Sequence, residues 1–193
     1  AVALCVAKAA ETLNQRPQKI QVLLSANILK NAMGVGIPGT DMIGLPIAVA
    51  LGALIGKSEY QLEVLKDSTP EAVEAGKKMI EAQAIQISLK ENIEEKLYIE
   101  VTCMAGEEKA TAIISGGHTN FVYLSKNDSV LMDKRSGTSG ETEEESVELN
   151  LKKVYDFATT SPIEELQFIL EAKRLNKQAA ERSFKGNYGH ELG

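Results

Sequence analysis

The sequence predicts an α+β fold: a mostly antiparallel sheet packed against helices, with helices at both ends of the chain. Residues 97–133 hold four short segments in which apolar and polar side chains alternate between turns, which is typical of an antiparallel meander. Residues 1–14 and 149–185 instead place apolar side chains at helical spacing. With 193 residues, 44% of them hydrophobic, the chain is long enough to enclose a core.

The first half of the chain is predicted to be mainly helical, with one strand. Arg16-Pro17 ends the first helix, because proline removes a backbone donor. Pro46 begins an apolar helix whose Gly and Ala residues let another backbone come close. Thr69-Pro70 is typical of a helix N-terminus, with a hydroxyl cap before a proline. In order, we expect a helix at 1–14, a strand at 19–25, and helices at 46–56, 59–66 and 69–83.

The second half is predicted to hold the meander and then helices. The sequence Ser161-Pro162-Ile163-Glu164 has the pattern of a capping box and predicts the start of a long helix. Its expected buried stripe is Ile163, Leu166, Ile169 and Leu170. The expected strands are 97–103, 109–115, 120–125 and 129–133, and a helix at 149–159 precedes the long one.

Three regions follow from these patterns. Residues 1–134 are predicted to form an α/β domain that contains the meander. Residues 135–148 are acidic and rich in Ser, Gly and Thr, and they predict a mobile loop. Residues 149–193 are predicted to form C-terminal helices that pack on the same domain or lead to a missing second half.

Composition argues against several classes of protein. The net charge of −6, without a basic stripe, argues against nucleic-acid binding. The longest apolar run, 43–55, is too short to span a membrane and is interrupted by Gly and Pro. Cys5 and Cys103 lie far apart without a C-x-x-C partner, which favours buried, unpaired, metal-free thiols in a reducing compartment. We therefore expect a cytoplasmic protein.

A glycine-rich segment follows the first predicted strand. Gly34, Gly36 and Gly39 match the spacing G-x-G-x-x-G of a dinucleotide site. The helix that such a site needs is not predicted here, because Pro38 and Pro46 bracket the segment and no second parallel strand follows. We favour a backbone-lined loop that approaches a ligand or another chain.

Two polar segments are further candidates. Asn27, Lys30 and Asn31 place donors and one cation beside the glycine loop, which suits a small carboxylate or amino acid; solubility and turn chemistry would explain them equally well. In the second segment, Gly116 and Gly117 let the chain bend sharply, which places the His118 imidazole and the Thr119 hydroxyl at the sheet edge. An ordinary hairpin turn with an exposed histidine is the alternative. We identify neither a metal site nor a catalytic residue.

Several long segments together resemble the L-cysteine desulfidase family, which is related to the alpha chain of iron–sulfur-dependent L-serine dehydratase. They are AVALCVAKAAETL, SANILKNAMGVGIPGTDMIGLPIAVALGALIG, VLKDSTPE, EKLYIEVTCMAGEEKATAIISGGHTNFVYL and KGNYGHELG. The resemblance implies α,β-elimination from a small amino acid: L-cysteine to pyruvate, ammonia and hydrogen sulfide, or L-serine to pyruvate and ammonia. It also implies a [4Fe–4S] cluster that acts as a Lewis acid.

The chain departs from the family pattern at its cysteines. The family's Cys-Thr-Glu-Pro motif would stand just before Ala1, and its other cluster cysteines belong to a C-terminal half; Cys5 and Cys103 match no ligand position. We therefore expect a fragment of a longer enzyme, lacking N- and C-terminal parts, that binds no cluster and is inactive by itself. The alternative is a non-catalytic domain for amino-acid binding or subunit contact, and a homo-oligomer is compatible with either.

The predicted substrate side combines the segments named above. We expect the Asn27–Asn31 strand end, the Gly34–Gly39 loop and the Gly116–Asn120 turn to converge, because each alone offers too few donors for a small amino acid. This requires the 19–25 strand to lie beside the meander in one sheet. The expected substrate-binding residues are Asn27, Lys30, Asn31, Gly34, Gly36, Gly39, Thr40, His118, Thr119 and Asn120.

Overall fold

A computed structural model describes residues 1–37, 40, 42–135 and 149–186 of the chain. The chain divides into two compact units, Ala1–Ser139 and Gly140–Gly193. The first contains a sheet with helices and the second contains helices, so the predicted α+β class is confirmed. Apart from Arg135, the predicted mobile loop at 135–148 lies outside the described residues.

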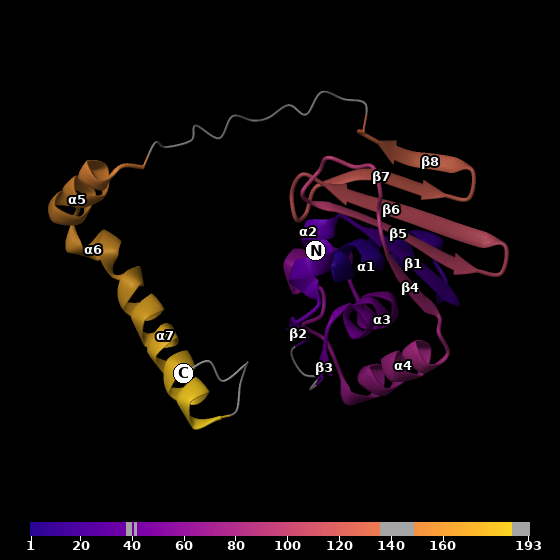
Figure 1. Cartoon of the computed structure of the whole chain (residues 1–193), viewed down its shortest axis with the longest axis horizontal. Coiled ribbons are helices and arrows are strands. Elements are labelled where there is room, and N and C mark those ends of the chain that lie inside the picture. Colours follow the sequence, from indigo (N-terminus) through magenta and orange to yellow (C-terminus); the bar gives the residue numbers. More distant parts are fainter. Residues whose placement is uncertain (38–39, 41, 136–148, 187–193) are drawn as a thin grey trace. The chain divides into compact units, whose positions relative to one another are not determined.

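The first unit is built around a sheet with the strand order β4-β1-β5-β6-β7-β8 (Figure 1). Its strands are β1 (Lys19–Leu24), β4 (Ile85–Leu89), β5 (Tyr98–Ala105), β6 (Glu108–Ser115), β7 (Phe121–Lys126) and β8 (Ser129–Asp133). A separate hairpin joins β2 (Gly36–Ile37) to β3 (Met42–Ile43). The helices are α1 (Val2–Leu13), α2 (Ala26–Ala32), α3 (Leu45–Ile55), the 3₁₀ helix η1 (Ser58–Glu63) and α4 (Pro70–Glu81).

The sheet is antiparallel except at one edge. β5 to β8 form the predicted meander, and β1 pairs antiparallel with β5, so the expected 19–25 strand does lie beside the meander. β4 pairs parallel with β1 and was not predicted. Ile85, Ile87 and Ser88 are all half-buried, as suits a short edge strand.

The helices form layers on one face of the sheet. α1 packs on β5 and β6, α3 packs on α1, and α4 packs on α3 (Figure 1). In β5 every second residue is buried, which leaves the opposite face of the sheet half-exposed. The core between α1 and the sheet contains Leu4, Val6, Val101 and Ile114, all with no exposed surface.

α1 and α3 approach each other closely because of small residues. A Cβ atom on Gly52 would lie 2.7 Å from the Ala3 carbonyl oxygen. The predicted role of Gly and Ala in this helix is therefore confirmed. α4 begins as predicted: Pro70 lies in its first turn, and the Thr69 hydroxyl accepts a hydrogen bond from the Ala72 N–H at 3.3 Å.

The second unit contains α5 (Leu151–Thr160), α6 (Ile163–Leu166) and α7 (Phe168–Lys185). The predicted long helix is wrong in two respects. It is interrupted at Gln167, and α6 has no side-chain cap, so the capping box does not form. Within this unit taken by itself, the predicted stripe is not buried, since Ile163 and Leu170 are 68% and 67% exposed. Among the described residues of this unit there are only helices, and no strand that could cover the stripe.

A membrane-spanning helix is absent from residues 1–37, 40, 42–135 and 149–186: none of the helices described there is both long enough and apolar enough to cross a bilayer.

Candidate functional site

At one end of the sheet, β1 and β6 end on either side of the start of β5. The segments that follow β1 and β6 therefore lie near each other. The Ser25 N–H donates to the Tyr98 carbonyl at 3.0 Å, so the end of β1 lies beside the start of β5. The Gly116 N–H donates to the Leu97 carbonyl at 3.0 Å, which brings the turn after β6 to the same edge. Because β1 and β6 flank β5, their ends are two interstrand spacings apart, about 10 Å.

The Ser25 side chain fixes this junction. Its hydroxyl donates to the Lys96 carbonyl at 2.9 Å and accepts from the Tyr98 N–H at 3.3 Å. Ser25 is 3% exposed, so these two bonds satisfy a polar group that water cannot reach. α2 begins directly after it, and the Leu29 N–H donates to the Ser25 carbonyl at 3.0 Å.

A cavity of about 530 Å³ opens at this junction. Its volume lies within the range of small-molecule sites. Of the predicted site residues, Asn27 belongs to its wall. The wall also contains a loop that the sequence did not single out, because that loop follows the unpredicted strand β4. The lining residues are Ser25, Ala26, Asn27 and residues 89–96.

Lys90 brings a positive charge to this wall. Its Nζ lies 2.8 Å from Oε2 of Glu100, and the Tyr98 hydroxyl donates to the same oxygen at 2.7 Å. Burial and the hydrogen bond to Glu100 raise the pKa of Tyr98, which keeps this hydroxyl protonated as a donor. The Lys90 ammonium has three N–H groups, so it can bind Glu100 and still donate to a carboxylate ligand.

The segment that begins at Asn27 is not the loop expected from the sequence but helix α2. Ile28 and Leu29 pack against the core, and this apolar contact stabilises the helical turn. Lys30 and Asn31 are exposed, and the described wall of the cavity includes neither of them. The structure therefore separates Asn27 from the other two predicted residues of this segment.

The glycine segment lies beside α3 and α4. Gly34 and Gly36 are exposed, and Gly36 is paired in the β2–β3 hairpin. Thr40 is buried, and its hydroxyl donates to the Ile37 carbonyl at 2.7 Å, so it closes the hairpin instead of facing a ligand. Gly39 lies outside the described residues. Of the three segments expected to converge, the Asn27 segment and the Gly116–Asn120 turn lie at the same end of the sheet. The glycine segment belongs instead to the β2–β3 hairpin.

The turn between β6 and β7 exposes His118 and Thr119. Gly116 has a φ of 77°, a conformation that favours glycine and allows the sharp bend. The Asn120 side-chain nitrogen donates to the Ser115 carbonyl at 2.9 Å, so this amide closes the turn. His118 and Thr119 are therefore the side chains of this turn that can reach a ligand at the sheet edge.

The two cysteines do not fit an iron–sulfur cluster. Cys5 and Cys103 are free thiols with no exposed surface, as the sequence predicted for their burial and lack of a disulfide. Burial raises the pKa of Cys103 to about 12 and also raises the pKa of Cys5, which disfavours the thiolates that iron requires. Among the described residues, no three His, Cys, Asp or Glu side chains are grouped to hold a metal ion.

Neither a family model nor a solved structure matches this chain.

Several bacterial proteins are similar to the whole chain. A UPF0597 protein of Bacteroides fragilis is 73% identical over 193 residues, and one of Phocaeicola vulgatus is 72% identical over 193 residues. A more distant UPF0597 protein, from Clostridium perfringens, is 36% identical over 193 residues. In each case the match covers 100% of this chain and 45% of the relative, so the chain spans less than half the length of the curated relatives it matches.

Proposed function

We propose that this chain forms the substrate-binding part of a lyase that performs α,β-elimination on a small L-amino acid. The products would be pyruvate, ammonia and hydrogen sulfide from L-cysteine, or pyruvate and ammonia from L-serine. The proposal is supported by the resemblance of five segments to the L-cysteine desulfidase family. The structural observation that carries it is the junction at Ser25, where a cavity of about 530 Å³ opens at the same end of the sheet as the turn that contains His118.

The cavity wall contains both positively and negatively charged side chains, as the binding of a zwitterionic ligand requires. Lys90 can bind the α-carboxylate, and the Asn27 amide can orient it. The acidic residues of the same loop can bind the α-ammonium group. His118 lies on the turn after β6, at the same end of the sheet as the cavity. The acidic lining residues are Glu91, Glu94 and Glu95.

The iron–sulfur cluster that the resemblance implies would belong to another part of the protein. Cys5 and Cys103 do not fit it, for the reasons given above. The role proposed for this chain is therefore limited to binding and orienting the amino acid. We also propose a cytoplasmic location, because two free thiols suit a reducing compartment.

The test compares the 193-residue chain with the product of the complete coding region that contains it. Both are prepared anaerobically and given L-cysteine or L-serine, and pyruvate, ammonia and sulfide are measured. We expect the complete protein to form pyruvate and ammonia in equal amounts, and the chain alone to bind the amino acid without turnover. Amino-acid binding without turnover in the complete protein would instead favour a binding domain, and neither binding nor turnover would refute both readings.

A further inference from the structure

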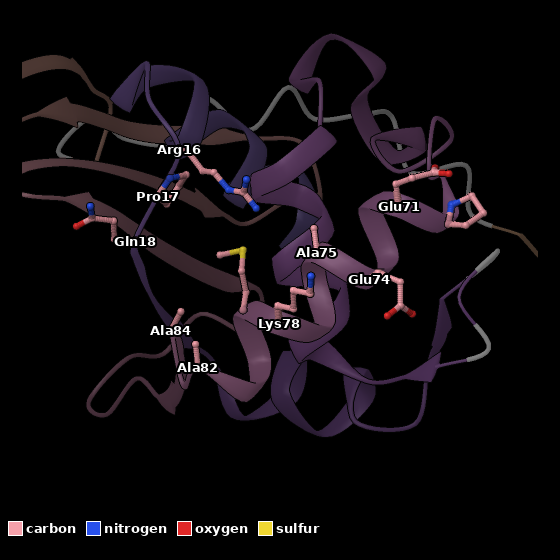
Figure 2. A pocket seen from close by; sticks show the side chains of 11 residues that line it. Arg16, Pro17, Gln18, Glu71, Glu74, Ala75, Lys78, Ala82 and Ala84 are labelled. Atoms are coloured by element: carbon pink, nitrogen blue, oxygen red, sulfur yellow. The ribbon is translucent and has the colours of Figure 1, made fainter.

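A second, larger groove lies at the opposite end of β1 from the candidate site. Its volume is about 890 Å³, and its walls are the segment before β1 and one side of α4 (Figure 2). It includes residues that precede both parallel strands, whereas the candidate site includes residues that follow them. The groove is lined by Arg16, Pro17, Gln18, Pro70, Glu71, Glu74, Ala75, Lys78, Met79, Ala82 and Ala84.

The middle of the groove is apolar. Ala75 and Met79 lie four residues apart on α4, and Ala82 follows three residues later as its C-cap, so the three form a stripe along one side of the helix. Pro17 and Ala84 contribute apolar surface from the strand side. Met79 is 8% exposed and anchors the stripe to the core. Such a surface suits an aliphatic chain.

Two cations point into the groove. Figure 2 shows the Arg16 guanidinium between Pro17 and Ala75, and the end of the Lys78 side chain next to Ala75 in this view. In the part of the chain that the structure describes, neither cation has a hydrogen bond or an ion pair. A guanidinium and an ammonium that face the same apolar surface provide donors for an anionic group.

The acidic residues of the groove are already engaged elsewhere. Glu74 pairs with Lys77, whose Nζ lies 2.6 Å from Oε1 of the carboxylate. The Glu71 carboxylate accepts hydrogen bonds from its own backbone N–H and from the Thr69 hydroxyl, which lower its pKa. Figure 2 shows both carboxylates along α4 at the end away from Pro17. The positive charge of Lys78 also helps to lower the pKa of Glu74, but without an ion pair between the two, so Lys78 and Arg16 both keep their N–H donors for an anionic ligand.

We propose that this groove binds a small organic carboxylate that carries an apolar chain. Arg16 and Lys78 hold the carboxylate, and the chain lies along the α4 stripe from Ala75 to Ala82. The volume is within the range of small-molecule sites, which combine an apolar lining with few polar groups. The site is separate from the candidate amino-acid site and does not depend on the function proposed for it.

The test uses octanoate as the probe, with two matched compounds that each lack one feature. Acetate keeps the carboxylate without the chain, and octanamide keeps the chain without the charge. Each is titrated into the 193-residue chain by calorimetry, and the methyl resonances of the methionines report contact at Met79. We expect octanoate to bind at least about tenfold more tightly than either analogue, because each loses one set of contacts. Equal binding of octanamide, or no binding of octanoate, overturns the proposal.

Three variants locate the site. Arg16→Gln and Lys78→Met should each weaken octanoate binding roughly tenfold, the loss of one charge-assisted hydrogen bond. Lys134→Met makes the same change of net charge as Lys78→Met but lies just after β8, at the other edge of the sheet. It should leave the affinity unchanged. Thermal unfolding checks that each variant is folded. Equal effects of the two lysine variants show non-specific attraction and overturn the proposal.

Discussion

Ser25 and Tyr98 are hydrogen-bonded to each other twice, through the Ser25 N–H and the Tyr98 carbonyl at 3.0 Å and through the Tyr98 N–H and the Ser25 hydroxyl at 3.3 Å. The first bond belongs to the β1–β5 pairing, and the second continues it through a side chain. Since the hydroxyl also binds the Lys96 carbonyl, one buried serine joins β1, β5 and the loop before β5.

Replacing this serine should destabilise the fold. Ser25→Ala leaves the Tyr98 N–H and the Lys96 carbonyl without their partner, and we expect a loss of about 1–3 kcal/mol in the free energy of unfolding. Urea unfolding measures it. Ser129→Ala makes the same change at the exposed start of β8 and should cost less than about 0.5 kcal/mol. Equal losses in the two variants would show that the junction does not depend on Ser25.

Gly52→Ala should also destabilise the protein, although alanine usually favours a helix. Its Cβ would lie 2.7 Å from the Ala3 carbonyl oxygen, and a backbone atom cannot move aside without separating α1 from α3. We expect a loss of about 1–3 kcal/mol. At Gly76 the nearest atom is the end of the Ile47 side chain, 3.0 Å away, so Gly76→Ala should cost less. A stabilising effect of Gly52→Ala would contradict the close packing.

Cys103 should make stability fall at alkaline pH. Burial raises its pKa from 9.0 to about 12, so between these values the unfolded chain releases a proton that the folded chain keeps. Stability is therefore unaffected below pH 9 and decreases above it, by up to about 1.4 kcal/mol per pH unit from this thiol. Urea unfolding under reducing conditions should show a shallower decrease for Cys103→Val. Parallel curves for the two proteins from pH 8 to pH 11 would refute this linkage.

The sequence predicted those parts of the fold in which one face of an element is clearly apolar. β5 alternates strictly between buried and half-buried residues, and its signal was plain. β4 also alternates, as IQISL, but over only five residues between a predicted helix and a polar loop, and this short signal was not recognised. In α2, the apolar spacing of Ile28, Leu29 and Ala32 is helical, but the polar residues between them favoured a loop.

The candidate site was predictable to a smaller extent, because its geometry depends on strand pairing. Asn27 was identified from its place after a predicted strand. Lys90 was not, because its position beside Asn27 requires β4 to pair with β1, with the Lys90 N–H donating to the Leu24 carbonyl at 2.8 Å. Long-range parallel pairing of this kind leaves no local signal in the sequence.

Asn27 and Asn31 provide a direct test of the candidate site. Both are exposed on α2, four residues apart, but Asn27 lines the cavity whereas Asn31 lies outside its described wall. Asn27→Ala should weaken L-cysteine binding to the chain about tenfold and raise KM of the complete protein to a similar extent, because the amide orients the carboxylate. Asn31→Ala makes the same chemical change and should stay within about twofold. Calorimetry on the chain and a pyruvate assay on the complete protein measure the two effects. If both variants behave alike, the cavity beside Ser25 is not where the amino acid binds, and the substrate site must be sought on another surface of the sheet.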